Sequence, residues 1–89
     1  PGDPVAQARQ VMANLATALA AAGARLTDVV KTTVYVASSE QADLVAVWQV
    51  VRDAFGDHEP PSTLLGVAVL GYDDQLVEVE AVAAVGTGA

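Results

Sequence analysis

The sequence predicts an α+β domain in which two helices pack on one face of a mixed β-sheet. Two amphipathic segments alternate with a run rich in β-branched residues, and two further extended segments follow the second helix. The predicted order is therefore helix, strand, helix, strand, strand, without an internal repeat or a linker. At 89 residues the chain is expected to be one domain, residues 1–89, with a small core rich in Ala and Val.

The first helix is expected between Asp3 and Gly23. Asp3 can accept hydrogen bonds from free N–H groups of the first turn, and Pro4 suits the first helical position because an N–H there would have no partner. Gly23 can adopt the left-handed conformation that ends many helices. The apolar residues between them recur at three- and four-residue spacing and form one stripe, which should face a sheet: Val5, Ala8, Met12, Leu15, Leu19 and Ala22.

The first strand is expected from about residue 27 to residue 36, because its β-branched residues favour an extended backbone. Successive side chains of a strand point to opposite faces of the sheet. One predicted face carries Val30, Thr32, Val34 and Val36, and the other carries Val29, Lys31, Thr33 and Tyr35.

The second helix is expected to follow Ser38. Ser38 and Gln41 resemble a capping box, and Gly56 marks the end of the helix. Its apolar stripe consists of Leu44, Val47, Trp48, Val51 and Phe55. The two aromatic residues of this stripe are expected in the core.

Two strands are expected after the Pro-containing loop 57–61. Residues 62–70 have apolar side chains in consecutive positions, which predicts a strand buried on both faces. Residues 71–75 have the composition of a turn, and residues 76–84 are expected to return as the second strand of a hairpin. The sheet face opposite the helices would then expose apolar side chains, so we expect the chain to self-associate.

Composition excludes several classes of function. The chain has no cysteine, so a thiolate nucleophile, a disulfide framework and Cys-based metal sites are excluded. Its formal net charge is −7, which opposes binding to a phosphate backbone, so nucleic acid is not an expected partner. No apolar run is long enough to span a bilayer, and no signal peptide is visible. We therefore expect a cytoplasmic protein without a membrane partner.

Four segments in this order resemble one family, the RidA/YjgF group of reactive-intermediate deaminases: residues 28–36, 55–57, 65–68 and 77–83. The resemblance implies the RidA/chorismate mutase-like fold and a homotrimer with ligand clefts between subunits. It also implies hydrolysis of imines or enamines without a cofactor. Members of the family normally begin with a β-hairpin before the first helix. Nothing in this chain corresponds to that hairpin, so its N-terminal strands are expected to be absent.

The resemblance also assigns candidate site residues. Glu80 falls where family members position a water molecule for attack on a C=N carbon. The alternative for Glu80 is a solvated or ion-paired carboxylate on an exposed face. Ser62 falls where the deaminating branch has an Arg that binds the substrate carboxylate, and a serine hydroxyl cannot replace that charge. Imines that carry a carboxylate are therefore not favoured as substrates.

Other groups extend or limit this hypothesis. Ser62 and Thr63 could donate hydrogen bonds to a ligand, although such residues often bond only to nearby backbone. Lys31 could bind an anion, or pair with an acidic residue of the last strand. Residues 57–59, Asp-His-Glu, are not expected to hold a metal ion, because neighbours on a short loop seldom converge on one ion.

Three functions remain open from the sequence. The first is an imine or enamine deaminase, a hydrolase that acts on small carbonyl- or imine-like metabolites. The second is a non-catalytic ligand-binding or assembly module of the same fold, which the serine at position 62 favours. The third, endoribonuclease activity, is the weakest, because the few basic residues are scattered along the chain.

Overall fold

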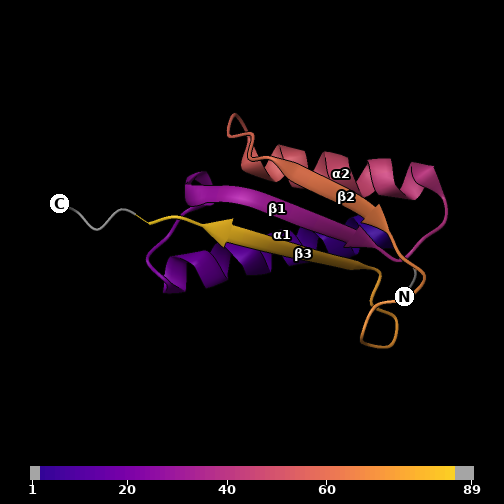
Figure 1. The fold of residues 1–89 in the computed structure, drawn as a ribbon. Coiled ribbons are helices and arrows are strands. Elements are labelled where there is room, and N and C mark those ends of the chain that lie inside the picture. Colours follow the sequence, from indigo (N-terminus) through magenta and orange to yellow (C-terminus); the bar gives the residue numbers. More distant parts are fainter. Residues whose placement is uncertain (1–2, 86–89) are drawn as a thin grey trace.

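The computed structural model describes residues 3–85 and contains two α-helices and three β-strands (Figure 1). Their order along the chain matches the predicted order of helices and strands. The elements are α1 (Pro4–Ala21), β1 (Val29–Val36), α2 (Gln41–Phe55), β2 (Ser62–Gly66) and β3 (Val77–Ala83), with a short 3-10 helix, η1 (Leu26–Asp28), before β1. None of the helices in the described part of the chain is long and apolar enough to cross a membrane.

β1 is the central strand of the sheet, and the strand order is β2-β1-β3. β2 runs parallel to β1, because α2 connects the two strands as a crossover. β3 runs antiparallel to β1 on its other side. The predicted hairpin between the last two strands is therefore wrong. β2 and β3 each form backbone hydrogen bonds with β1, which lies between them (Figure 1).

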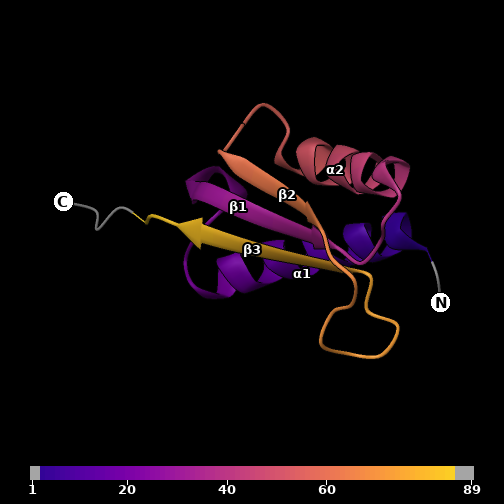
Figure 2. The ribbon, with the colours of Figure 1, turned by 45° about the vertical axis from the view of Figure 1, so that its right-hand side comes forward.

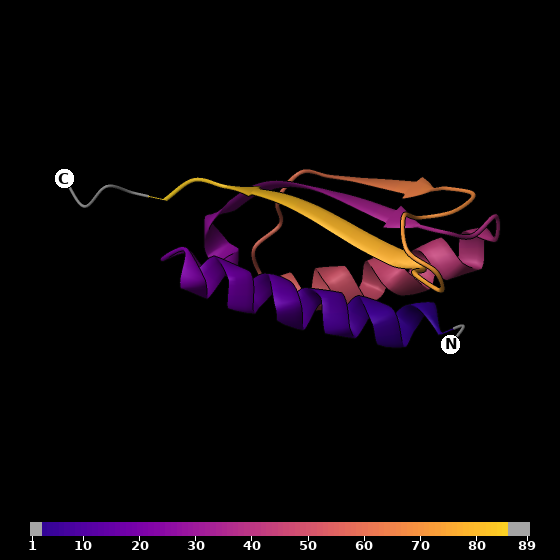
Figure 3. The same ribbon diagram turned by 90° about the horizontal axis from the view of Figure 1, so that it is seen from below.

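Both helices cover the same face of the sheet, which confirms the predicted two-layer α+β architecture (Figure 3). The core lies between these layers and is built mainly from valines of β1, α2 and β3. Val34, Val47 and Val51 are each 0% exposed. Phe55 belongs to the core as predicted, whereas Trp48 is only partly buried and packs against its border.

The ends of α1 follow the prediction. The Asp3 side chain accepts hydrogen bonds from the N–H groups of Val5 and Ala6, at 3.0 and 3.2 Å. Pro4 occupies the first helical position. Gly23 has a φ of 78°, the left-handed conformation expected after the last turn. Local sequence signals therefore define both ends of this helix.

The predicted capping box of α2 is not formed. The N-terminal capping residue is Glu40, and it makes no side-chain capping hydrogen bond. The Ser38 hydroxyl instead accepts a hydrogen bond from the N–H of Glu40 and donates one to Oδ2 of Asp43, at 3.0 and 2.8 Å. Ser38 therefore stabilises the first turn from two positions before the capping residue. Gly56 ends the helix with a φ of 65°, as predicted.

β2 differs most from its prediction. It ends at Gly66 instead of residue 70, and it is largely exposed instead of buried on both faces. Two features explain the difference: β2 is an edge strand with one neighbour, and the helices cover only one face of the sheet. β1 begins at Val29 because residues 26–28 form the 3-10 helix, where Asp28 Oδ2 accepts a hydrogen bond from the N–H of Arg25 at 2.8 Å.

Figure 2 shows the loop between β2 and β3 extending beyond the end of the sheet. The side chain of Gln7 fixes this loop to α1. The Gln7 amide nitrogen donates to the carbonyl of Asp74 at 2.9 Å, and its amide oxygen accepts from the N–H of Leu76 at 2.7 Å. Leu76 directly precedes β3. This one side chain therefore holds the start of the last strand against the first helix.

Candidate functional site

The sheet face opposite the helices carries polar side chains on all three strands. Its accessibility follows from the architecture, because no helix of the described chain covers this face (Figure 3). A bulge in β1 between Val29 and Lys31 changes the predicted alternation of side chains. Val29 is 1% exposed and joins the core, whereas Val30 is 48% exposed, so the predicted faces of these two residues are exchanged. Beyond the bulge, Lys31, Thr33 and Tyr35 lie on the open face as predicted.

A hollow of about 220 Å³ on the open face is lined by two residues of β1 and two of β3. These residues are Lys31, Thr33, Glu80 and Val82. Thr33 lies at the centre of the sheet and pairs in register with Glu80 on one side and Thr63 on the other. Three of the four predicted site residues, Lys31, Thr63 and Glu80, therefore lie on one face around Thr33.

Tyr35 holds the carboxylate of Glu80. Its hydroxyl donates a hydrogen bond to Glu80 Oε1 at an O···O distance of 2.5 Å. This bond raises the pKa of the Tyr35 hydroxyl above its ordinary value of 10.0. Tyr35 therefore stays a protonated donor at neutral pH, and one Glu80 oxygen is fixed. The other oxygen, Oε2, forms no hydrogen bond within residues 3–85.

Ser62 lies on the opposite face of the sheet from Glu80. Its Oγ is 2.5 Å from the hydroxyl of Thr32, which is 2% exposed and faces the helices. Ser62 also donates to the carbonyl of Pro60 at 3.0 Å. Its single hydrogen is therefore directed to protein backbone, and the Thr32 hydroxyl donates to Ser62. One chain does not bring Ser62 together with Glu80, and the ligand-binding role of Ser62 stays a prediction.

Lys31 remains available in the hollow. Within residues 3–85 it forms no ion pair, and the side-chain pair present there is Arg52–Asp53 at 3.6 Å. The ammonium of Lys31 and the carboxylate of Glu80 thus line the same hollow without neutralising each other at short range. A cation and a base on one surface suit a polar substrate.

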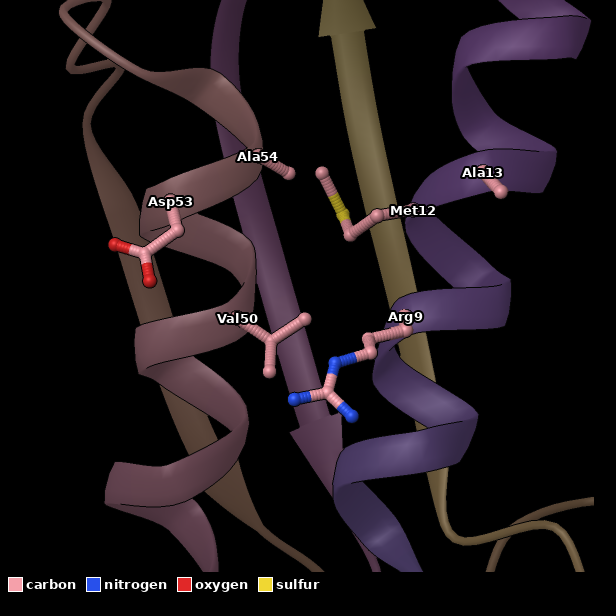
Figure 4. Close-up of a pocket in the computed structure, with 6 residues that line it drawn as sticks. All are labelled: Arg9, Met12, Ala13, Val50, Asp53 and Ala54. Atoms are coloured by element: carbon pink, nitrogen blue, oxygen red, sulfur yellow. The ribbon is translucent and has the colours of Figure 1, made fainter.

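Two other hollows lie on the helical side of the molecule. A shallow one of about 450 Å³ separates α1 from α2 and is lined by Arg9, Met12, Ala13, Val50, Asp53 and Ala54. In Figure 4, Arg9 extends toward Val50, whereas the Asp53 carboxylate points away from Arg9. A smaller one of about 100 Å³ lies beside Ser62 at the C-terminal end of α2. Within the described chain, no group of three or more His, Asp or Glu side chains could hold a metal ion.

The sequence pattern did not identify Tyr35 as a partner of Glu80. A signal existed, because Tyr35 shares its predicted face with Lys31 and Thr33. The missing information was the register, in which Tyr35 lies opposite Glu78 and Thr33 lies opposite Glu80. Without the strand order, two residues 45 positions apart could not be assigned to each other.

Comparisons with known proteins agree on one family. A family model described as Endoribonuclease L-PSP matches residues 1–85. A RutC family protein of Pyrococcus horikoshii is 38% identical over 82 residues, which cover 92% of this chain and 63% of that protein. The chain therefore spans less than two thirds of that relative.

Solved structures extend the likeness to the fold. A Mycobacterium tuberculosis member of the YjgF/YER057c/UK114 family has a TM-score of 0.86 and 36% identity, and the match covers 96% of this chain and 70% of that one. Escherichia coli TdcF, crystallised with bound serine, has a TM-score of 0.82 and 29% identity. That match covers 97% of this chain and 68% of TdcF.

Proposed function

Because the chain belongs to the RidA/YjgF family, we propose that it binds small imines or enamines and hydrolyses them to a carbonyl compound and ammonia. The observation that carries this proposal is the hydrogen bond from Tyr35 to Glu80 at the edge of the polar hollow. It leaves a carboxylate with one oxygen fixed and the other free to accept a proton. The hollow offers this base to a small molecule from solvent.

Glu80 is the proposed general base. A water molecule bonded to its free oxygen attacks the C=N carbon as one of its protons passes to Glu80, and Glu80 delivers this proton to the imine nitrogen. A C–O bond forms, and the C=N double bond becomes a C–N single bond. The carbinolamine then collapses: Glu80 accepts its hydroxyl proton and passes it to the nitrogen, the C–N bond breaks, and ammonia leaves. One imine and one water yield one carbonyl compound and one ammonia, so no oxidant or cofactor is needed.

Lys31 and Thr63 are the proposed substrate-binding groups of this face. The ammonium of Lys31 suits a carbonyl or carboxylate oxygen of the substrate, and the Thr63 hydroxyl can donate a further hydrogen bond. Both lie next to Thr33 on the open face: Lys31 is two positions earlier on β1, and Thr63 pairs with Thr33 across to β2. Glu80 pairs with Thr33 on the other side. Ser62 faces the helices and therefore cannot contact a ligand in this hollow. It could bind a ligand only at the outer edge of β2 or at a contact with another subunit.

A homotrimer with clefts between subunits is the proposed assembly. Leu65 of β2 and Val82 of β3 are 43% and 52% exposed, and both lie on the open face beside the polar residues. Burying such side chains against another copy would remove apolar area from water and enclose the hollow. The serine bound to Escherichia coli TdcF supports a small polar metabolite as the ligand of this family.

A non-catalytic binding module is the second candidate, and Ser62 in place of the family's Arg favours it. RNA cleavage, the activity in the description of the family model, is less favoured. Eleven acidic side chains outnumber four basic ones, so the overall field opposes a phosphate backbone.

The test replaces the proposed base and a neighbour that matches it. Glu80→Gln should lower the rate of ammonia release from imines about 10²- to 10⁴-fold, the usual contribution of a general base. Glu78→Gln removes the same charge from the same strand and face, and should change the rate less than about threefold. The imines are generated in place by an amino-acid oxidase, which gives carboxylate-bearing imines, and by an amine oxidase, which gives imines without a carboxylate.

Equal rates for Glu80→Gln and the unmodified protein would remove Glu80 from the mechanism. Absence of turnover in the unmodified protein, combined with a ligand-induced rise in melting temperature for a 2-oxo acid, would favour the binding module. Circular dichroism and light scattering of both variants establish that a lost rate is not lost folding.

A further inference from the structure

The outer surface of the helical layer carries a groove between α1 and α2. One end of this groove is the shallow hollow of about 450 Å³ that contains Arg9 and Asp53 (Figure 4). A further hollow of about 530 Å³ continues it toward the C-terminal end of α1. Ala54 lines both hollows, so the two form one continuous groove.

The groove has an apolar floor. Met12 and Phe55, which are 4% and 7% exposed, belong to this floor. The wall on α1 is a single helical face, because its residues recur at three- and four-residue spacing: Arg9, Ala13, Ala16 and Ala20. The alanine side chains are short, so the backbone of another helix can approach the floor closely.

The shape of the groove fits a helix better than a small molecule. In helical bundles, two helices that pack side by side form a groove that a third helix fills. Arg9 and Ala20 are eleven positions apart on α1, which is about 17 Å along a helix axis, and the groove continues to Arg25. A partner helix of about four to five turns spans this length. A small ligand would leave most of so long and shallow a surface exposed.

Charge distinguishes the groove from the rest of an acidic chain. Two of the four basic residues, Arg9 and Arg25, lie in it, one in each hollow, although the formal net charge is −7. Within residues 3–85 neither of these side chains forms an ion pair. Asp53 lies on the wall opposite Arg9, and its carboxylate points away from that residue (Figure 4). A complementary helix therefore carries acidic residues along the edge beside α1 and a basic residue along the edge beside α2.

We infer that this groove binds an amphipathic helix of a partner protein, with small or apolar residues toward the floor and acidic residues facing Arg9 and Arg25. The inference goes beyond the proposed hydrolysis, because Glu80 projects from the open face of the sheet and the groove lies on the helical side. The proposed assembly also uses the open face, so the groove stays accessible in it. Partner binding and turnover therefore use different surfaces of one chain.

The test uses a synthetic helical peptide of about 18 residues as the probe. Its apolar face consists of leucine and alanine. One edge carries a glutamate in the first turn and another in the last turn, and the opposite edge carries a lysine. Fluorescence anisotropy of a labelled probe should rise in a saturable way as protein is added. A scrambled peptide of the same composition has no continuous apolar face and should bind at least about tenfold more weakly.

Matched substitutions on α1 test whether the probe lies in the groove. Ala20→Gln places a longer, polar side chain in the groove and should weaken binding by about tenfold or more. Ala18→Gln makes the same change at an exposed position outside the groove and should leave the affinity within about twofold. If Ala20→Gln fails to fold, Ala13→Gln in the first hollow takes its place.

Arg9 tests the charge complementarity. Arg9→Glu should weaken binding of the probe about three- to tenfold, because an exposed attractive pair becomes a repulsive one. A second probe, with lysines in place of both glutamates, should prefer Arg9→Glu to the unmodified protein. A third probe, with glutamines at these positions, should bind both proteins with affinities within about twofold of each other.

The inference fails if the first probe and the scrambled peptide bind equally, if Ala20→Gln and Ala18→Gln weaken binding equally, or if the lysine probe does not prefer Arg9→Glu. Light scattering without peptide tests another occupant. A lower mass for Ala20→Gln than for the unmodified protein would mean that a second copy of the chain fills the groove, and would overturn the inference. Glu80→Gln should bind the probe normally, so a failure of the proposed hydrolysis and a failure of this groove give different results.

Discussion

The two faces of the sheet use the same central strand for different purposes. On the helical face, Val34 and Val36 of β1 are each 0% exposed and pack in the core. On the open face, Thr33 and Tyr35 lie between the polar side chains of the neighbouring strands. Neighbouring residues of one strand thus contribute in turn to the core and to the proposed site. Substitutions one position apart should therefore have effects of different kinds.

The largest expected effect comes from placing a charge on each face in turn. Val34→Asp buries a carboxylate without a partner and should destabilise the fold by at least about 3–5 kcal/mol, a large part of a typical stability of 5–15 kcal/mol. Thr33→Asp, one residue earlier, should cost less than about 1 kcal/mol, mainly through repulsion by Glu80. Urea unfolding followed by circular dichroism measures both. Similar urea midpoints for the two variants would mean that Val34 is not more deeply buried than Thr33.

A smaller effect is expected for self-association, which we assign to the open face. Leu65→Lys should leave the fold intact and weaken association by about tenfold or more, because a charge replaces an apolar contact. Val69→Lys makes the same change in the loop after β2, where the side chain is 77% exposed, and should not alter association. Light scattering gives the mass of each. A 9.0 kDa monomer for the unmodified protein would refute the assembly.

The smallest expected effect is a pH dependence from Tyr35. Its folded-state pKa is raised above 10.0, so its contribution to stability is complete below pH 10 and is lost as the pH rises through the folded-state pKa. Melting temperatures above pH 10 should therefore fall more steeply for the unmodified protein than for Tyr35→Phe. All other titratable groups are present in both proteins, so the difference belongs to Tyr35.

The same pKa can be measured directly. The chain has two tyrosines, so Tyr72→Phe leaves only Tyr35 to report through its phenolate absorbance. We expect its midpoint above 10.0, and a midpoint at or below this value would show that the bond to Glu80 is not formed in solution.

Local signals in the sequence were sufficient for the fold class and for α1. Asp3, Pro4 and Gly23 each act through groups within a few residues, so their roles can be derived without knowing the rest of the fold. Ser38 shows the limit of such signals. Its hydroxyl stabilises the start of α2, but the helix begins with Glu40 as its cap, because boundaries depend on one or two residues.

Pairing between distant segments could not be derived in this way. The predicted hairpin failed because both strands pair with β1, and apolar patterning does not state which strands are neighbours. For the same reason, the sequence could not show which site residues share a face of the sheet. In the structure, Lys31, Thr63 and Glu80 lie on one face, whereas Ser62 projects from the other. The parallel register of β2, with Ser62 opposite Thr32, decides its direction.

The attachment of the last strand by Gln7 also bears on the order of folding. β1, α2 and β2 are consecutive in the chain, whereas Gln7 and Leu76 are 69 positions apart. Closing so long a segment costs more entropy, and such distant contacts generally form later than local ones. During synthesis, Glu80 cannot join Tyr35 until β3 has left the ribosome and docked beside β1. We therefore expect the nascent chain to form the unit of β1, α2 and β2 first and to position its proposed base at a late step.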